Sequence, residues 1–331
     1  MKNNTNNNRK DADQAIKKAI SYATSKSTPK SAKIIIALLL AAVLLFTLND
    51  LFFKIDGIPT WKDIYSASGG SANIPAENEA RVHFIDVGQG DCELIVTHTK
   101  SVLIDCGERE YYKNVIDYIR NLGIEKLDYV IATHPHADHI GGMSYILDEF
   151  DIGTLIMPEV KSSMIPTTNT YKRLLEAVKN KDINVEYAKA GKSYTVDDAV
   201  MTVLSPVNDY NDLNNYSVTV KLTHGENSFL FTGDIEKEAE RDILDSGADV
   251  SALVFKAAHH GSSTSNSKEF LNEVSPDYAV IEVGEGNDYG HPHDETVKRL
   301  KNMNITIYRT DTSGNIIFVS NGSTLEILTE K

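Results

Sequence analysis

Cysteine is nearly absent from this sequence, because only Cys92 and Cys106 occur in 331 residues, too few for a disulfide framework. An excess of positive charge is also missing: 47 acidic residues outnumber 33 basic ones and leave a net charge of −14. That balance argues against broad adhesion to nucleic acid through surface charge. No internal repeat is visible, which excludes a repeat architecture. With 41% hydrophobic and 24% charged residues, the chain is neither a disordered nor a collagen-like protein.

Long apolar runs are scarce as well, and the one exception is residues 34–48, which read IIIALLLAAVLLFTL and contain no charge. Residues 1–33 before it hold eight basic and two acidic side chains, so the rest of the chain carries a net charge of −20. A positive flank before an apolar run predicts that residues 34–53 form one transmembrane helix with a cytoplasmic N-terminus. A cleaved signal peptide and a buried helix are the alternative interpretations.

The segments around this run predict four parts of the chain. Residues 1–33 form a basic, Asn-rich cytoplasmic tail, residues 34–53 the anchor in the cell membrane, and residues 54–80 a linker rich in Gly, Ser, Pro and Asn. Residues 81–331 then form an extracellular α/β domain, in which short β-branched runs alternate with helical patterns. Strands joined mainly by hairpins predict two sheets covered by helices, rather than one doubly wound sheet.

The strongest chemical signal is HPHADH at residues 134–139, which follows a predicted strand at 128–132 and precedes two glycines and a helix. It places four metal-competent side chains within six residues, namely His134, His136, Asp138 and His139. Because the first two histidines project to one side of a tight loop and the last two residues to another, one such loop can serve two adjacent metal ions. A solvated histidine-rich loop is the alternative interpretation.

These residues carry a family resemblance. HPHADHIGG resembles the HxHxDH signature of the metallo-β-lactamase superfamily. More narrowly, residues 81–331 resemble the extracellular metallo-hydrolase domain of ComEC-type competence proteins, which take up DNA, through FIDVGQGDCELIV, LIDCG, FTGDIE, KAAHHGSSTS and YGHPH. The resemblance implies a four-layer αββα sandwich. The apolar run adds one N-terminal transmembrane helix before it, where ComEC-type proteins carry a long run of membrane helices. It also implies a site for two divalent metal ions, Zn²⁺ or Mn²⁺, at one edge of the sandwich.

The resemblance assigns the remaining metal ligands. It implies that Asp234 bridges both ions, since one carboxylate can offer an oxygen to each of two cations; a helix N-cap is the alternative role for this residue. Of His259 and His260, His260 more closely resembles the last ligand of the family. Consecutive residues of a strand point to opposite faces, so one of the two histidines is expected to bind metal directly and the other to orient it or contact substrate.

One family ligand is missing from the sequence. The superfamily supplies a further histidine between HPHADH and the bridging aspartate, and only His224 is available there. Hairpin geometry places His224 at the end of a strand opposite Asp234, so Asn215 is expected where the histidine would stand. The first ion then keeps His134, His136 and Asp234, and fewer imidazoles shift the preference from zinc towards manganese.

Two aspartates and two cysteines lie near this edge. Asp86 and Asp105 end neighbouring strands, where a carboxylate can accept the second N–H of a ligand histidine, although both also suit plain turns. Cys92 and Cys106 face each other if the hairpin turn between them has three residues centred on Thr99. They are then either two buried thiols or a cross-strand disulfide.

The remaining candidates concern the substrate. His291 resembles the late histidine of phosphodiesterases with this fold, which contacts phosphate or protonates the leaving oxygen; an exposed loop histidine is the alternative. Asp138 and His291 are the predicted catalytic residues, and Tyr289 and Ser262 are placed near the substrate.

Together the residues and the resemblance predict a membrane-anchored extracellular metal-dependent hydrolase that uses a metal-bridging hydroxide. The substrate expected is a phosphodiester, such as DNA, a nucleotide, or a teichoic-acid-type or phosphocholine ester, and no obligate protein partner is inferred. Hydrolysis of a lactam, lactone or other ester is the alternative within enzymes. A non-catalytic surface or DNA-uptake accessory protein is the alternative from another class.

Overall fold

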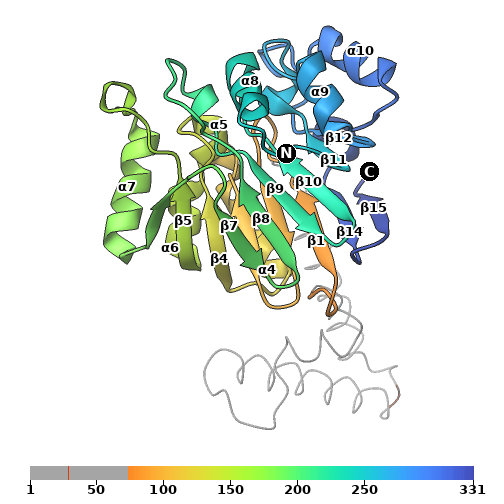
Figure 1. Ribbon diagram of the computed structural model, residues 1–331. Helices are drawn as coiled ribbons and strands as arrows, with labels where there is room; N and C mark the ends of the chain where they lie inside the picture. Colours follow the sequence, from red (N-terminus) through yellow and green to blue (C-terminus); the bar gives the residue numbers. More distant parts are fainter. Residues whose placement is uncertain (1–28, 30–73) are drawn as a thin grey trace. The chain divides into compact units, whose positions relative to one another are not determined.

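The computed structural model describes residue 29 and residues 74–331, coloured in Figure 1. The predicted anchor at 34–53 lies outside the described residues, as do the tail except for Pro29 and the linker up to residue 73. Among the helices that are described, none has the length and apolar character that a membrane span requires. The described residues 74–331 include the whole domain that was predicted from residue 81.

The first sheet has eight strands and is antiparallel at one side and parallel at the other. Its order is β15 (Leu325–Thr329), β14 (Ile316–Ser320), β1 (Ala80–Phe84), β2 (Glu93–Val96), β3 (Ser101–Ile104), β4 (Lys126–Ile131), β5 (Asp151–Met157) and β6 (Val185–Tyr187). The strands from β3 to β6 run parallel. The carboxyl ends of β3 and β4 therefore open at the same edge.

The second sheet has seven strands in the order β13 (Thr306–Arg309), β12 (Tyr278–Ile281), β11 (Val254–Lys256), β10 (Asn227–Phe231), β9 (Val220–His224), β8 (Ala199–Val203) and β7 (Ser193–Val196). Strands β10 to β13 are parallel, whereas β7 to β10 form antiparallel hairpins. The predicted strand 216–223 begins later than expected, because residues Asn214–Tyr216 form a 3₁₀ turn. Strand β7 was not predicted.

Side chains that alternate between the two faces of each strand explain why the domain has layers of helices and sheets. Phe229 and Phe231 of β10 point into a core shared by both sheets, together with Phe84 and Phe318 of the first sheet. Leu230 between them points to the opposite face, into a second core beneath the helices. Since successive strand residues face opposite sides of a sheet, both sheets bury both faces. The predicted pair of packed sheets is confirmed.

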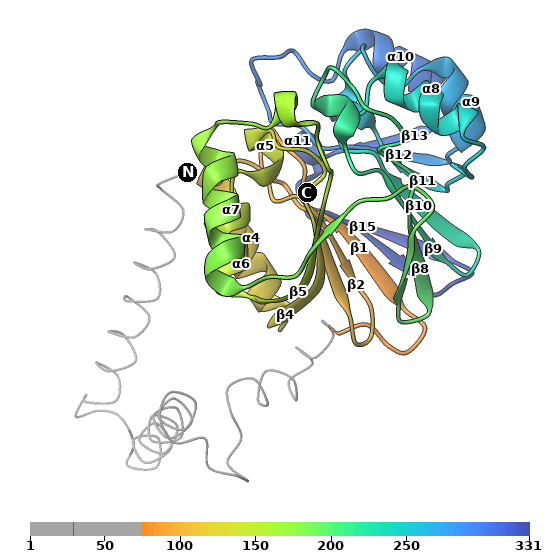
Figure 2. The ribbon, with the colours of Figure 1, turned by 60° about the vertical axis from the view of Figure 1, so that its left-hand side comes forward.

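Helices cover the two outer faces, as Figure 2 shows for the two sides of the sandwich. Those on the first sheet are α4 (Tyr112–Asn121), α5 (Ala137–Ile140), α6 (Met143–Glu149) and α7 (Asn169–Lys181). Those on the second are α8 (Lys237–Asp245), α9 (Lys268–Val274) and α10 (Asp294–Asn302), and the short α11 (Thr310–Ser313) follows β13. Helix α7 begins where the Thr168 side chain accepts the N–H of Tyr171. Helix α9 begins in the same way at Ser267.

The hairpin between β2 and β3 corrects the cysteine geometry. Val96 pairs with Ser101 and Glu93 with Ile104, so the register differs by one residue from a turn centred on Thr99. Cys92 and Cys106 therefore do not face each other, and both are buried free thiols. The disulfide alternative is wrong.

Candidate metal centre

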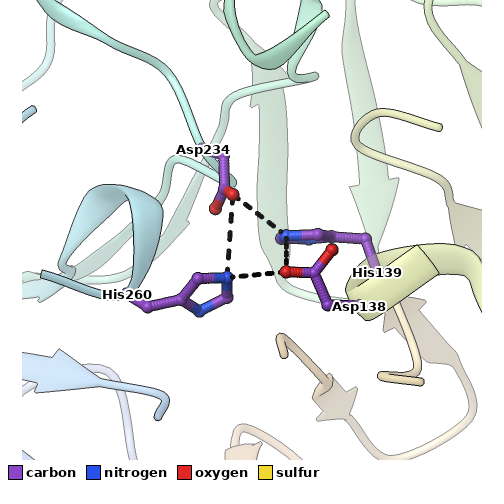
Figure 3. Close-up of side chains that lie close together, drawn as sticks. All are labelled: Asp138, His139, Asp234 and His260. Atoms are coloured by element: carbon purple, nitrogen blue, oxygen red, sulfur yellow. Dashed lines mark ion pairs between the residues drawn. The ribbon is translucent and has the colours of Figure 1, made fainter. Parts of the chain in front are cut away.

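Four side chains from three segments converge at the edge where the parallel strands end (Figure 3). Asp138 and His139 come from α5, Asp234 from the loop after β10, and His260 from the 3₁₀ turn after β11. One ligand atom from each lies within 4.8 Å of the others. Oδ2 of Asp234 lies 3.3 Å from Nε2 of His139 and 3.6 Å from Nε2 of His260. The predicted grouping of these residues is therefore present.

The HPHADH loop is held from below by Asp105. Its carboxylate accepts the backbone N–H of Thr133 at 2.9 Å and the hydroxyl of the same residue at 2.5 Å. The same carboxylate lies 2.7 Å from Nδ1 of His139, and both side chains are buried. The aspartate thus fixes both the start of the loop and the orientation of His139, as expected for an acceptor behind a metal ligand.

Asp234 is directed at the histidines and does not cap a helix. Helix α8 begins at Lys237 after Glu236, two residues beyond Asp234, and has no side-chain cap. The backbone N–H of Asp234 donates to the hydroxyl of Ser217 at 3.0 Å, which anchors the turn. The N-cap alternative for Asp234 is therefore wrong.

His259 and His260 lie outside any strand, which corrects the geometric argument made from the sequence. Strand β11 ends at Lys256, and both histidines adopt left-handed backbone conformations, with φ of 53° and 52°. Such conformations are costly for residues other than glycine and are typical of functional sites. His260 is buried, whereas the His259 side chain is 22% exposed and its Nε2 lies 3.7 Å from Oδ2 of Asp234. Both rings thus face the cluster.

Unsatisfied atoms at the centre of the cluster fit a divalent cation. Nε2 of His139, Nε2 of His260 and Oδ1 of Asp234 are buried and have no hydrogen-bond partner among the described residues. Buried polar atoms are normally bonded, and these three are common metal ligands. The residues present therefore fit a bound metal ion, and Asp138, His139, Asp234 and His260 would hold it.

The electrostatics of the cluster also favour a cation. Burial opposes charge on His139, but the carboxylates of Asp234 and Asp105 outweigh it and raise the pKa of His139 well above its usual value. Burial likewise opposes charge on His260, yet the nearby carboxylates of Asp234 and Asp91 raise its pKa to about 10. Without metal, these histidines supply the positive charge that the buried carboxylates require.

A second group of possible ligands, His134 and His136, lies beside the first. Nε2 of His134 is 3.9 Å from Oδ2 of Asp234, and it lies 3.0 Å from Nδ1 of His136. Nδ1 of His134 contacts the hydroxyls of Thr133 and Ser217 at 3.1 and 3.2 Å. These contacts leave Nε2 of His134 directed towards Asp234 and His136.

Asn215 and Asp86 form their hydrogen bonds away from the ligand histidines. The side chain of Asn215 accepts the N–H of Glu236 at 2.8 Å and donates to Glu238 at 3.4 Å, so it holds the segment that leads into α8. Asp86 accepts the N–H of Gly88 within its own turn at 3.2 Å. Neither residue has a hydrogen bond to a ligand histidine among the described residues. A role for Asn215 or Asp86 beside the metal ligands is therefore not supported. Residues of this type stabilise loops as readily as they bind metals.

His224 occupies the place that hairpin geometry predicted. It ends β9 at the turn opposite Asp234, where its Nδ1 lies 2.7 Å from the Ser320 hydroxyl and its Nε2 3.1 Å from Asp198. Its exclusion from the metal site is confirmed.

His291 forms the rim of the site. Its ring centroid lies 5.5 Å from that of His259 and 6.2 Å from that of His260. Burial, followed by the neighbouring histidines, lowers the pKa of His291 to about 4. The ring of Tyr289 stacks against His291 at 5.7 Å and is 65% exposed, which places Tyr289 where a substrate group can reach it. Ser262 contacts the Thr264 hydroxyl at 3.0 Å.

A buried ion pair behind the ligands was not predicted from the sequence. Nζ of Lys256, at the end of β11, lies 2.7 Å from Oδ2 of Asp91, and both side chains are fully buried. Glu282 also belongs to this group, since its backbone carbonyl lies 2.9 Å from Nδ1 of His260. A lysine within an otherwise apolar strand segment was the available signal, because buried lysines require a partner.

Comparison with known proteins agrees with this site. A family model described as the metallo-beta-lactamase superfamily matches residues 85–284. The chain belongs to this superfamily, so the family inferred from HPHADHIGG is confirmed.

Its relatives include the competence proteins that the narrower motifs resemble. The chain is similar to ComE operon protein 3 of Bacillus subtilis (strain 168), with 31% identity over 258 residues that cover 72% of this chain and 33% of that protein. It is 28% identical to competence protein ComA of Neisseria gonorrhoeae, over 73% of this chain and 32% of that protein. Recombination protein 2 of Haemophilus influenzae is also 28% identical, over 91% of this chain and 34% of that protein. The chain thus spans about a third of the length of these relatives.

Solved structures with a related chain path include the metallo-beta-lactamase fold protein YhfI from Bacillus subtilis. Its TM-score is 0.48 at 13% sequence identity, and the match covers 73% of this chain and 100% of that one. The diiron β-hydroxylase CmlA from Streptomyces venezuelae has a TM-score of 0.49 at 13% identity, over 77% of this chain and 55% of that one.

Proposed function

We propose that this protein is a metal-dependent phosphodiesterase whose centre is formed by Asp138, His139, Asp234 and His260. The observation that carries the proposal is the convergence of these buried ligand atoms, three of which lack any hydrogen-bond partner among the described residues. A second ion held by His134, His136 and Asp234 would complete a two-metal site. When bound, divalent ions activate water and polarise a phosphoryl oxygen.

The protein's own residues would bind and orient the substrate. His291 faces the centre from the rim, where its imidazole can donate a hydrogen bond to a phosphate oxygen or to the leaving oxygen. Nδ1 of His291 has no hydrogen-bond partner among the described residues, so no protein group competes with substrate for this ring. The predicted substrate contact of Ser262 is not part of this proposal, because its buried hydroxyl bonds to Thr264. Phosphodiesters suit this site because their non-bridging oxygens accept such bonds.

The substrate class is supported by the relatives and constrained by charge. Competence protein ComA and recombination protein 2 are named for processes that involve DNA, which supports a nucleic acid or nucleotide substrate. The net charge of −20 beyond residue 33 repels a long polyanion away from the metal centre. Short single strands and small diesters are therefore expected to be cleaved faster than long duplex DNA.

A substrate panel tests this function. The purified full chain, loaded with manganese or zinc, is expected to hydrolyse bis-p-nitrophenyl phosphate, and the Asp138→Ala variant is expected to be inactive. Asp198→Asn, at the opposite end of the sheet, is a control that should retain activity. Turnover of a lactam or lactone without cleavage of any diester would instead favour the alternative hydrolase class. Metal binding without turnover of any substrate would favour a non-catalytic role.

We also propose that residues 34–53 anchor the protein in the cell membrane, with the catalytic domain outside. The support is the uncharged run at 34–48 preceded by a net positive segment. Protease added to intact protoplasts should then digest the domain. Protection of the domain until the cells are lysed would contradict this orientation.

A further inference from the structure

We infer that Asp91, held by Lys256, is a positioning residue that orients the ligand histidines of the metal centre from behind. The inference concerns the geometry of the metal centre and does not depend on which substrate is hydrolysed. It rests on contacts of Asp91 with the two segments that carry the metal ligands and with the buried Lys256.

The first contact is with His260. Oδ1 of Asp91 lies 3.2 Å from Nδ1 of His260, on the side of the ring opposite to the unpartnered Nε2. The Nδ1 atom also bonds to the Glu282 carbonyl at 2.9 Å. The Glu282 carbonyl accepts a hydrogen bond from Nδ1, and the negative charge of Asp91 beside it also favours a proton there, so that Nε2 is free to bind metal. This matters because the left-handed backbone of His260 does not by itself fix the direction of the ring.

The second contact is with the HPHADH loop. The backbone N–H of Asp91 donates to the carbonyl of Asp138 at 3.2 Å, and Oδ2 of Asp91 lies 3.8 Å from Nδ1 of His139. A side chain at Gly90 would place its Cβ 2.2 Å from the Asp138 carbonyl oxygen, so glycine is required for this close approach. Asp91 therefore touches the loop that supplies two ligands as well as the turn that supplies His260.

The third contact fixes Asp91 itself. Its carboxylate bonds to Nζ of Lys256 at 2.7 Å, and Lys256 ends the strand that leads to His260. Carboxylate oxygens of Asp91, Glu93 and Glu282 lie within 4.8 Å of one another, and all three side chains are buried. The ammonium of Lys256 already supplies the cation that such a group needs, so this second acidic cluster supports the metal centre and is not another metal site.

The test compares metal binding with stability. Replacing both members of the pair by neutral groups of similar size, in Asp91→Asn/Lys256→Met, removes one buried charge of each sign, so the metal-free protein should lose less stability than either single variant, which would leave one charge unpaired. If Asp91 positions His260, the affinity for zinc and cobalt should nevertheless fall about 10- to 100-fold. The visible absorption of bound cobalt should also change, because it reports the ligand geometry.

Two further variants make the test decisive. Asp91→Glu keeps the charge pair but moves the carboxylate, and it should also weaken cobalt binding by about 10-fold. Asp198→Asn/His224→Gln removes a comparable pair at the far end of β9, where Nε2 of His224 lies 3.1 Å from Asp198, and it should leave cobalt binding unchanged. Wild-type affinity and an unchanged cobalt spectrum in Asp91→Glu, or in a folded Asp91→Asn/Lys256→Met protein, would overturn the inference. The pair would then serve stability alone.

Discussion

Nδ1 of His139 lies 2.7 Å from Oδ2 of Asp105, and both groups are shielded from solvent at the base of the metal centre. The contact fixes the ring so that Nε2 faces Asp234. Asp105→Asn replaces a charged acceptor by an amide, so we expect metal affinity to fall about 10- to 100-fold. Zinc competition titration of the two proteins measures this loss. Equal affinities would show that Asp105 has only its loop-holding role.

Asp234 is expected to affect both ions. Because its Oδ2 approaches His134, His139 and His260, the Asp234→Ala variant should lose metal from both positions. His134→Ala should mainly affect one position, since His134 belongs only to the proposed second ligand group. Elemental analysis of the two purified variants decides this point. Wild-type metal content in Asp234→Ala would refute the bridging role.

His291 is expected to affect turnover more than metal binding. Its ring lies at the rim, with its centroid 6.2 Å from that of His260. His291 is not one of the side chains proposed to bind the metal ions. His291→Ala should lower kcat on small diesters about 100-fold or more, the usual effect of losing a proton-transfer group. Metal content should stay as in the wild type. A parallel loss of metal would place His291 among the ligands instead.

His83 predicts a pH dependence of stability away from the metal centre. Burial, with the charge of Arg81, lowers the pKa of His83 to about 3, from an ordinary value of 6.5. The unfolded chain therefore binds more protons between pH 3 and 6.5, and the contribution of neutral His83 to stability is lost as the pH falls through this window.

Comparison with His83→Gln isolates this effect. From pH 6 to pH 4, the unfolding free energy of the wild type should fall by about 2 kcal/mol more than that of the variant. Urea unfolding followed by circular dichroism measures the difference. Parallel pH profiles would mean that His83 titrates in the folded protein as it does in the unfolded chain.

The sequence was sufficient for the parts of the site that lie in short motifs at strand ends. HPHADH was singled out at a strand end and Asp105 at the edge of a hairpin, and the family resemblance added the aspartate after β10 to the same site. The two packed sheets followed from the hairpins and helical patterns. These features depend on local pattern and on general rules of topology.

Other features depend on contacts that a single sequence does not reveal. Asp91 and Lys256 are 165 residues apart, so their pairing becomes visible only in the folded chain. The left-handed turn at His259 and His260 is imposed by its surroundings, against the preference of both residues. Asn215 was expected where the family has a histidine, near the ions or the substrate, but its amide bonds to the segment before α8.

The most direct test of the account is a metal titration in which bound metal and diester hydrolysis are followed in the same sample. Manganese or zinc is added to the metal-free full chain while bis-p-nitrophenyl phosphate is present. We predict that turnover rises as the ions bind, and that Asp234→Ala shows neither binding nor turnover. If the wild-type chain binds the ions fully and hydrolyses a lactam or lactone but no diester, the proposed phosphodiesterase function is contradicted.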